Sequence, residues 1–85
     1  MFSAAESQEL IRLIAERAGI AALRMRQTAK ATLYLERATA LPGATWRSWN
    51  ALGVAADWQD NWAKADEAYA KARQLAPRSA ESANN

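Results

Sequence analysis

The chain has 85 residues, 51% of them hydrophobic and 24% charged, with a formal net charge of +2. This size and composition indicate one small folded domain and exclude a chain that is disordered throughout. The absence of cysteine and histidine excludes disulfide bonds and removes the usual ligands of zinc, copper and haem. We therefore expect no cofactor and no metal site.

The basic residues show no concentration along the chain, because eleven Lys and Arg residues are scattered among nine Asp and Glu residues. Nucleic-acid-binding proteins usually carry a concentrated basic patch, so we expect no nucleic-acid partner. No apolar run approaches the roughly 20 residues that span a bilayer, so no membrane insertion is expected. The N-terminal residues lack the basic and apolar regions of a secretory signal, and the compartment stays open.

Strong helix formers dominate the chain, and a first helix is predicted to begin at its N-terminus. Ser3-Ala4-Ala5-Glu6 fits a capping box, in which the Ser and Glu side chains each bind a backbone N–H group of the other. Apolar residues then recur every three or four positions and predict one broad packing face for this helix. They are Leu10, Ile14, Ala18, Ala21 and Met25, with Ile11 and Leu13 beside them.

Three further apolar faces predict three further helices, because each repeats at helical spacing. No segment alternates with a period of two, so we expect an all-α fold. The faces are, in chain order, Ala31, Leu35, Ala38 and Leu41; then Trp49, Leu52, Gly53 and Ala56; then Trp62, Ala65, Tyr69, Ala72 and Leu75.

Four short breaks separate the predicted helices. The clearest is 41–45, where Pro42 cannot continue a helix and Gly43 tolerates left-handed geometry. A weaker break at 58–61 offers Asp60 or Asn61 as the N-cap of the last helix. The other two breaks are 25–28, which is the weakest, and 76–79.

The two halves of the chain repeat one pattern at an offset of about 34 residues, a period typical of helical repeats. Gly19 aligns with Gly53 and Leu41 with Leu75, and the two prolines are nearly matched. The aligned alanines carry less weight in a chain rich in alanine. We therefore predict one helical hairpin used twice, giving two stacked antiparallel hairpins.

Small residues in the second half predict where its two helices cross, because close crossings need short side chains. Gly53, Ala65 and Ala72 are expected at the crossing. Larger side chains are expected to fill the space above and below it, and these are Trp49, Leu52, Trp62, Tyr69 and Leu75.

The second half resembles the tetratricopeptide repeat family in Trp49-x-x-Leu52-Gly53, followed by Trp62, Ala65, Tyr69, Ala72, Leu75 and Pro77. The first half resembles a degenerate copy, with Ala15 and Ala18 where the family prefers Trp and Leu. Arg26 and Asp60 occupy a turn position where the family prefers Gly. The resemblance divides the chain into an N-terminal helical extension (1–11), a degenerate repeat (12–45), a repeat (46–79) and a tail or the start of a third repeat (80–85).

The chain also resembles, more weakly, the tetratricopeptide component of tight-adherence (Flp) pilus assembly systems in bacteria. The matching segments are Leu52-Gly53-Val54-Ala55-x-Asp57, then Tyr69-x-x-Ala72-x-x-Leu75-x-Pro77-x-Ser79, and the closing Asn84-Asn85. This resemblance implies a role in pilus or secretion assembly, and a periplasmic or outer-membrane-associated location.

The family resemblance implies a non-catalytic protein-interaction scaffold that binds a peptide or protein segment in a concave groove. No nucleophile stands beside a plausible base, so no catalytic residue is predicted. For Ile20 and Leu23 the alternative is simple core packing. The groove positions implied by the resemblance are Leu13, Glu16, Arg17, Ile20, Leu23 and Arg24, with Arg47, Asn50, Val54, Asp57 and Trp58.

The alternative function is a structural self-association module without a separate ligand. Repeat arrays bury their core between neighbours, and about three units are usually needed for stability. The chain would then be a piece of a longer array or a homo-oligomer, joined through Ala68, Tyr69 and Ala72 on the last helix.

Two smaller features have competing interpretations. Trp46 and Trp58 could anchor a partner, although packing within the hairpins is favoured. Asp57, Asp60 and Asn61 gather at one turn and could form a weak calcium site, although helix capping is strongly favoured.

Overall fold

The computed structural model describes residues 3–77, and this part of the chain contains four helices and no strand. The all-α prediction is therefore confirmed. The helices are α1 (Ala4–Arg24), α2 (Thr28–Ala40), α3 (Trp46–Trp58) and α4 (Trp62–Leu75).

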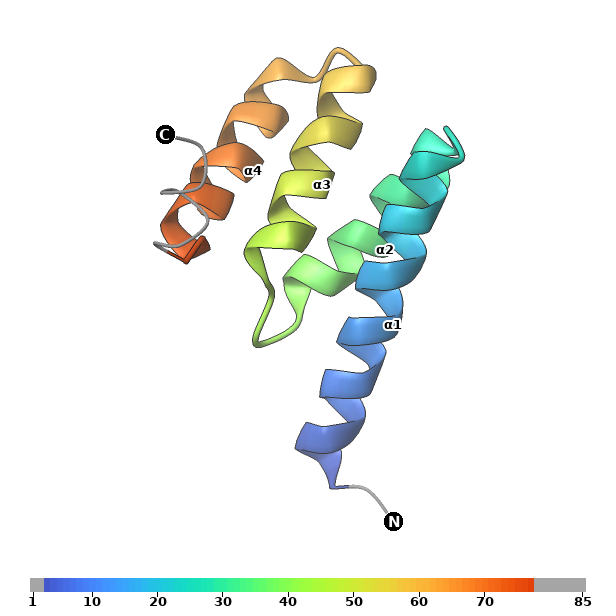
Figure 1. Ribbon diagram of the computed structural model, residues 1–85, viewed down its shortest axis with the longest axis vertical. Coiled ribbons are helices and arrows are strands. Elements are labelled where there is room, and N and C mark those ends of the chain that lie inside the picture. The colour runs from blue at the N-terminus through green and yellow to red at the C-terminus, as the bar shows by residue number, and fades with distance from the viewer. Residues whose placement is uncertain (1–2, 78–85) are drawn as a thin grey trace.

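The four helices form two antiparallel hairpins, as predicted (Figure 1). The first hairpin pairs α1 with α2, and the second pairs α3 with α4. Helix α3 also packs against both α1 and α2, so it joins the second hairpin to the first. The first half of α1 extends beyond the other helices at the N-terminal end of the molecule (Figure 1).

Side chains cap the N-termini of α1, α3 and α4, whereas Gln27 at the start of α2 makes no capping hydrogen bond with its side chain. The capping box is confirmed, since Ser3 Oγ accepts from the Glu6 N–H and Glu6 Oε1 accepts from the Ser3 N–H. Of the two predicted caps for α4, Asn61 is the one that forms, and its Oδ1 accepts from the Lys64 N–H. These caps satisfy backbone donors that a helix start leaves free.

The two hairpins turn in the same way. Arg26, after α1, has a φ of 62°, and Asp60, after α3, has a φ of 58°. In each turn this residue donates its N–H to the carbonyl three residues back, and the next residue donates to the carbonyl five back. This is the Schellman motif that ends helices with one left-handed residue. The turns lie 34 positions apart, so the repeated pattern extends to the backbone.

In each hairpin, the two helices pack closely against each other at a glycine of the first helix. A Cβ atom built on Gly19 would come within 2.6 Å of Leu35 Cγ, and one on Gly53 within 2.6 Å of Tyr69 Cε1. Real Cβ atoms do not approach other atoms this closely, so both helix pairs depend on the missing side chain. The predicted role of Gly53 at the crossing agrees with this geometry.

The core is built mainly from alanine, with few large side chains. Its central cluster joins all four helices, and Ile20, Leu23 and Trp49 pack against it while half-buried. The cluster comprises Ala22, Ala31, Leu35, Ala51, Leu52 and Ala68.

Two large residues predicted to fill the second hairpin lie outside it. Trp62 is 60% exposed and Leu75 is 48% exposed. They are the first and the last residue of α4. That prediction was wrong for these two residues, whereas Leu52 is buried and Trp49 and Tyr69 are half-buried.

The packing face of α1 also differs from the prediction. Ile14 is 66% exposed, and α1 instead buries the face that carries Ala15, Gly19 and Ala22. Small side chains let α2 approach α1 closely, and this close packing decides the orientation of the helix. The regular apolar spacing therefore predicted the helix correctly but its buried side wrongly.

Candidate protein-binding site

The residues predicted to bind a peptide lie on α1 and α3, which pack directly against each other. Their exposure varies widely. Arg17, Arg24, Arg47, Asn50 and Trp58 are exposed, and Glu16 is buried. The remaining five are half-buried, namely Leu13, Ile20, Leu23, Val54 and Asp57.

Glu16 ties α1 to the start of α3. Its Oε1 accepts a hydrogen bond of 2.6 Å from Ser48 Oγ and another from Thr45 Oγ1. Thr45 also caps α3 through the Ser48 N–H, so one cluster both starts this helix and fixes it to the first hairpin. Glu16 is only 9% exposed, which commits its carboxylate to the interior rather than to a ligand.

The surroundings of Glu16 favour its charged form. Burial alone raises the pKa of this carboxyl, but the bonds from Ser48 and Thr45 and the charges of Arg12 and Arg47 outweigh that effect. The pKa therefore lies below its ordinary value of 4.5. Hydrogen bonds to a carboxylate stabilise the anion and lower its proton affinity.

Arg12 is a buried cation that the sequence analysis did not single out. It is 7% exposed, and its Nη2 lies 4.0 Å from Glu9 Oε1. Its Nε and Nη1 atoms are buried without a hydrogen-bond partner in the described chain. Helical spacing does not reveal this position, because Arg12 is buried between α1 and the chain near Gly43.

The second acidic residue of the predicted site, Asp57, is bound within its own hairpin. Its Oδ2 accepts a hydrogen bond of 2.8 Å from Tyr69 Oη. Burial, this hydrogen bond and the charge of Asp57 raise the pKa of Tyr69 to about 12. The bond also holds the Tyr69 ring in place over Gly53.

Two of the four tryptophan rings make a cation–π contact with an arginine. The Arg26 guanidinium lies 4.3 Å from the ring centroid of Trp58, and that of Arg47 lies 5.2 Å from the ring centroid of Trp46. Trp58 is 43% exposed, so part of its ring is accessible as an anchor. The Arg26–Trp58 contact also links the two hairpins.

The residues predicted for self-association are mostly inside the molecule. Ala68 is 1% exposed and Ala72 is 5% exposed, while Tyr69 is half-buried and bound to Asp57. α4 packs these alanines within the hairpin, so they do not form an open surface for a second copy. The sequence therefore located the side of α4 that packs within the chain.

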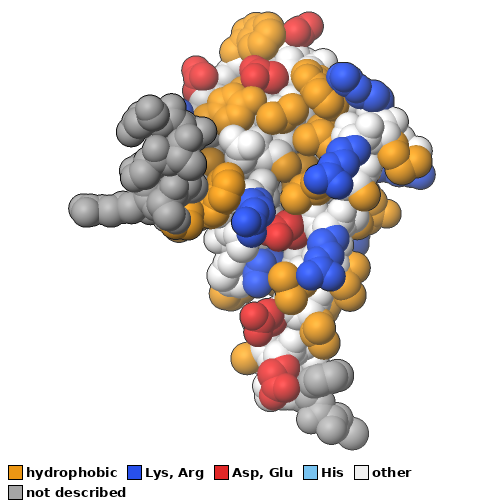
Figure 2. All heavy atoms as spheres, in the orientation of Figure 1, with side chains coloured by type: hydrophobic (Ala, Val, Ile, Leu, Met, Phe, Trp, Pro, Cys, Tyr) orange, Lys and Arg blue, Asp and Glu red, His pale blue; other side chains and the backbone are white. Residues whose placement is uncertain are grey.

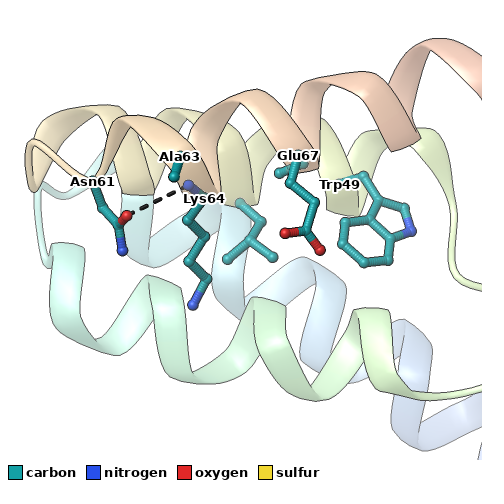
Figure 3. A pocket seen from close by; sticks show the side chains of 7 residues that line it. Trp49, Asn61, Ala63, Lys64 and Glu67 are labelled. Carbon is teal, nitrogen blue, oxygen red and sulfur yellow. Dashed lines mark hydrogen bonds between the residues drawn. The ribbon is translucent and has the colours of Figure 1, made fainter.

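A cavity of about 360 Å³ lies between α3 and α4, on the side that faces α2. Figure 3 shows Lys64 and Glu67 from α4 and Trp49 from α3 around it, with the Asn61 cap at one end. Lys64 Nζ reaches across to Glu36 of α2 and forms an ion pair. None of the eleven predicted peptide-binding residues lines this cavity, and the residues that do line it show no sequence pattern beyond ordinary helix packing.

Residues 3–77 contain no group of three potential metal ligands. At the turn considered for calcium, Asp57 accepts from Tyr69 and Asn61 caps α4. Within the same range, no helix combines the length and the apolar character that crossing a membrane requires.

Comparison with known proteins finds a family match for the second hairpin. Residues 46–79 match the sequence model of a family described as Tetratricopeptide repeat. No curated protein and no solved structure matches the chain. The matched segment begins at the first residue of α3 and includes all of α4. The α3–α4 hairpin thus matches a tetratricopeptide repeat, a unit that generally mediates protein–protein interactions.

Proposed function

We propose that the chain is a non-catalytic scaffold that binds an acidic peptide segment along α1 and α3. The family match of α3 and α4 supports a protein partner. The predicted groove residues lie on these two packed helices, and the half-buried Leu13, Ile20 and Val54 would supply apolar contacts. A peptide with apolar anchors and a few polar contacts suits such a surface.

The proposed preference for an acidic peptide rests on the positive charge of this surface. Arg17, Arg24 and Arg47 are exposed. The two carboxylates among the same positions, Glu16 and Asp57, already accept hydrogen bonds from the chain itself. A bound segment therefore meets cations with spare donors, and these pair best with carboxylates.

Selection from a peptide display library tests this proposal. We expect acidic peptides with apolar residues to be enriched, and calorimetry to show weaker binding when their Glu residues are replaced by Gln. The double variant Arg17→Glu/Arg47→Glu should bind acidic peptides at least about tenfold more weakly, because the attraction between arginine and the peptide carboxylates is replaced by repulsion between carboxylates. Arg37→Glu/Arg73→Glu, which changes two exposed arginines on α2 and α4, should bind normally.

Two results would contradict the proposal. One is enrichment that is indifferent to peptide charge. The other is equal loss in both double variants, which would trace the effect to net charge rather than to this surface. Asn50→Ala/Val54→Asp gives a further check, because it should keep the helical content and abolish capture of the peptide.

We further propose that residues 12–45 form a degenerate repeat of the same kind. The left-handed residues at Arg26 and Asp60 and the crossings at Gly19 and Gly53 support it, since both pairs lie 34 positions apart. Assembly of a bacterial pilus or secretion system is a narrower version of the scaffold role. It is supported by the resemblance at 52–57 and at Asn84-Asn85, and the latter pair lies outside the described residues. Co-purification with pilus assembly components tests it.

A further inference from the structure

Helix α1 carries an apolar surface that residues 3–77 leave uncovered. Leu10 is 42% exposed, Ile11 is 55% exposed, and Ile14 and Met25 are each 66% exposed. Figure 2 shows hydrophobic side chains along α1 on its side away from α3. Contiguous exposed apolar surface usually marks an interaction site. We call six residues on this side of the helix the α1 stripe: Leu10, Ile11, Ile14, Ala18, Ala21 and Met25.

The corresponding side of α3 is buried. At the repeat offset of 34, Ile14 corresponds to Ser48 and Ala21 to Ala55, and both of these are 0% exposed. Helix α3 uses that side to pack against the first hairpin. The α1 stripe thus corresponds to the side of α3 that packs on the first hairpin, but nothing in residues 3–77 packs on the stripe. A helical partner would therefore fit it.

Polar contacts hold the second hairpin on the first. Ser48 Oγ donates to Glu16 across α3 and α1 at 2.6 Å. Gln59 Nε2 donates to Thr32 Oγ1 of α2 at 2.7 Å. The stacking inside the chain therefore depends on matched donors and acceptors at its interface.

A copy stacked head-to-tail in the same manner would lose both contacts. The two donors would be replaced by Ile14 and Met25, and the two acceptors by Asn50 and Asp66, which lie 34 positions further on. Placing an amide and a carboxylate against apolar side chains costs free energy, because their hydrogen bonds to water are not replaced. The α3–α4 hairpin of a second copy is therefore a poor occupant for the α1 stripe.

The α1 stripe instead matches itself in the antiparallel direction. Its large residues lie at the ends and its small residues lie towards the middle. When two copies cross at Ala18, Ile14 of one faces Ala21 of the other, and Leu10 faces Met25. Each Ile14 then packs against the small Ala21, while the large Leu10 and Met25 pack against each other at the two ends of the contact. The small Ala18 near the crossing permits a close helix approach of about 8 Å.

The charges on α1 favour the same direction. Its N-terminal half carries Glu6 and Glu9, and its C-terminal end carries Arg24, followed by Arg26. An antiparallel pair sets the acidic end of each helix beside the basic end of the other, whereas a parallel pair sets like charges together. Antiparallel helix dipoles also attract each other.

We propose that two copies of the chain associate through the α1 stripe, with their α1 helices antiparallel about a two-fold axis near Ala18. Such a contact is isologous, so it closes as a dimer rather than growing into a filament. The stripe rises only about 22 Å along the helix. The contact is therefore smaller than the roughly 800 Å² per partner of a standard interface, and the dimer should dissociate on dilution.

Sedimentation velocity over a concentration series tests the dimer. The wild-type chain should shift from monomer to dimer as its concentration rises. Ile14→Glu should weaken the association at least about tenfold, because it buries a charge at the interface. Leu33→Glu is the matched control, since Leu33 is 52% exposed on α2 and lies outside the stripe. It should associate as the wild type does.

Disulfide cross-linking tests the direction, because the chain contains no cysteine of its own. Ala18→Cys should form a disulfide between copies under mild oxidation. Leu10→Cys alone should not, whereas a mixture of Leu10→Cys and Met25→Cys chains should form a mixed dimer. Circular dichroism of each variant checks that helical content is unchanged.

Three results would overturn the proposal. They are a wild-type chain that stays monomeric at every concentration, equal weakening by Ile14→Glu and Leu33→Glu, and self-linking of Leu10→Cys, which requires parallel helices. The dimer does not depend on the proposed peptide binding. Ile14→Glu should leave peptide capture intact, and Arg17→Glu/Arg47→Glu should leave the Ala18→Cys cross-link intact.

Discussion

The backbone of Gly53 lies against the ring of Tyr69, and a Cβ atom at Gly53 would come within 2.6 Å of Tyr69 Cε1. The ring cannot swing aside freely, because Tyr69 Oη donates to Asp57 Oδ2 at 2.8 Å. One hydrogen bond and one missing side chain thus set how closely α3 and α4 pack.

Replacing Gly53 with alanine should destabilise the chain despite the better helix former. Alanine gains about 1 kcal/mol of helix propensity over glycine. Overlap with a fixed ring costs about 1–3 kcal/mol, so we expect a net loss of about 1 kcal/mol. Urea denaturation followed by far-UV circular dichroism measures the change.

The Tyr69→Ala background supplies the control for this substitution. Without the ring, Gly53→Ala should become neutral or stabilising, because only the helix propensity remains. Equal destabilisation in both backgrounds would show that the ring contact is not the cause.

Replacing Asp60 with glycine should stabilise the second hairpin by about 0.5–1 kcal/mol, because glycine adopts positive φ without the steric cost of a Cβ atom. Asp60 has a φ of 58° and a solvent-exposed side chain. Thermal unfolding measures the gain. Asp60→Ala is the control and should give no gain, since alanine keeps the Cβ; equal gains would rule out backbone strain as the source.

Acid should weaken the contact between the hairpins at Glu16. Its pKa is lowered in the folded chain, so its contribution is present above the ordinary value of 4.5 and is lost as the pH falls through the folded value. Glu16→Gln should cost about 1–3 kcal/mol at neutral pH. The stability curves of the two proteins should converge in acid.

The exposed Glu67 of α4 provides the comparison for this pH dependence. Glu67→Gln should keep the acid-dependent loss of the wild type. If Glu16→Gln keeps it as well, another carboxylate is responsible.

Tyr69 should ionise only in strong alkali. In a Tyr34→Phe variant it is the only tyrosine, and tyrosinate absorbance should rise with a midpoint of about 12 while the chain stays folded. Because the folded pKa lies above the unfolded value, the contribution of Tyr69 to stability is complete below pH 10.0 and is lost as the pH rises towards 12.

Asp57→Asn should lower that midpoint, because it removes the negative charge that opposes ionisation of the phenol. A folded Tyr34→Phe chain that titrates near the ordinary value of 10.0 would contradict the Tyr69–Asp57 pairing.

The local features of the fold could be predicted because they depend on neighbours in sequence. The Ser3 capping box, the Asn61 cap and the glycine crossings follow from side-chain chemistry within a few residues or from the repeat offset. The turns at Arg26 and Asp60 could be predicted because both residues align with a position where the family prefers glycine, and both have a positive φ in the structure.

The orientation of α1 and the partners of the candidate site could not be predicted in this way. Glu16 is buried because Thr45 and Ser48, about 30 positions away, bring hydroxyl groups to it. Periodicity reveals which residues share a helix face but not which face meets a neighbour. Ile14 and Ser48 stand at matching positions, yet one is exposed and the other is buried, because only the second hairpin has a neighbour on that side.

The distribution of aromatic residues gives the two hairpins different optical signatures. All four tryptophans lie in the second hairpin, at positions 46, 49, 58 and 62. Intrinsic fluorescence therefore follows the melting of α3 and α4 and is nearly blind to α1 and α2. The Arg26 guanidinium of the first hairpin lies 4.3 Å from the ring centroid of Trp58 in the second. The fluorescence of Trp58 should therefore change if the two hairpins separate before either one unfolds.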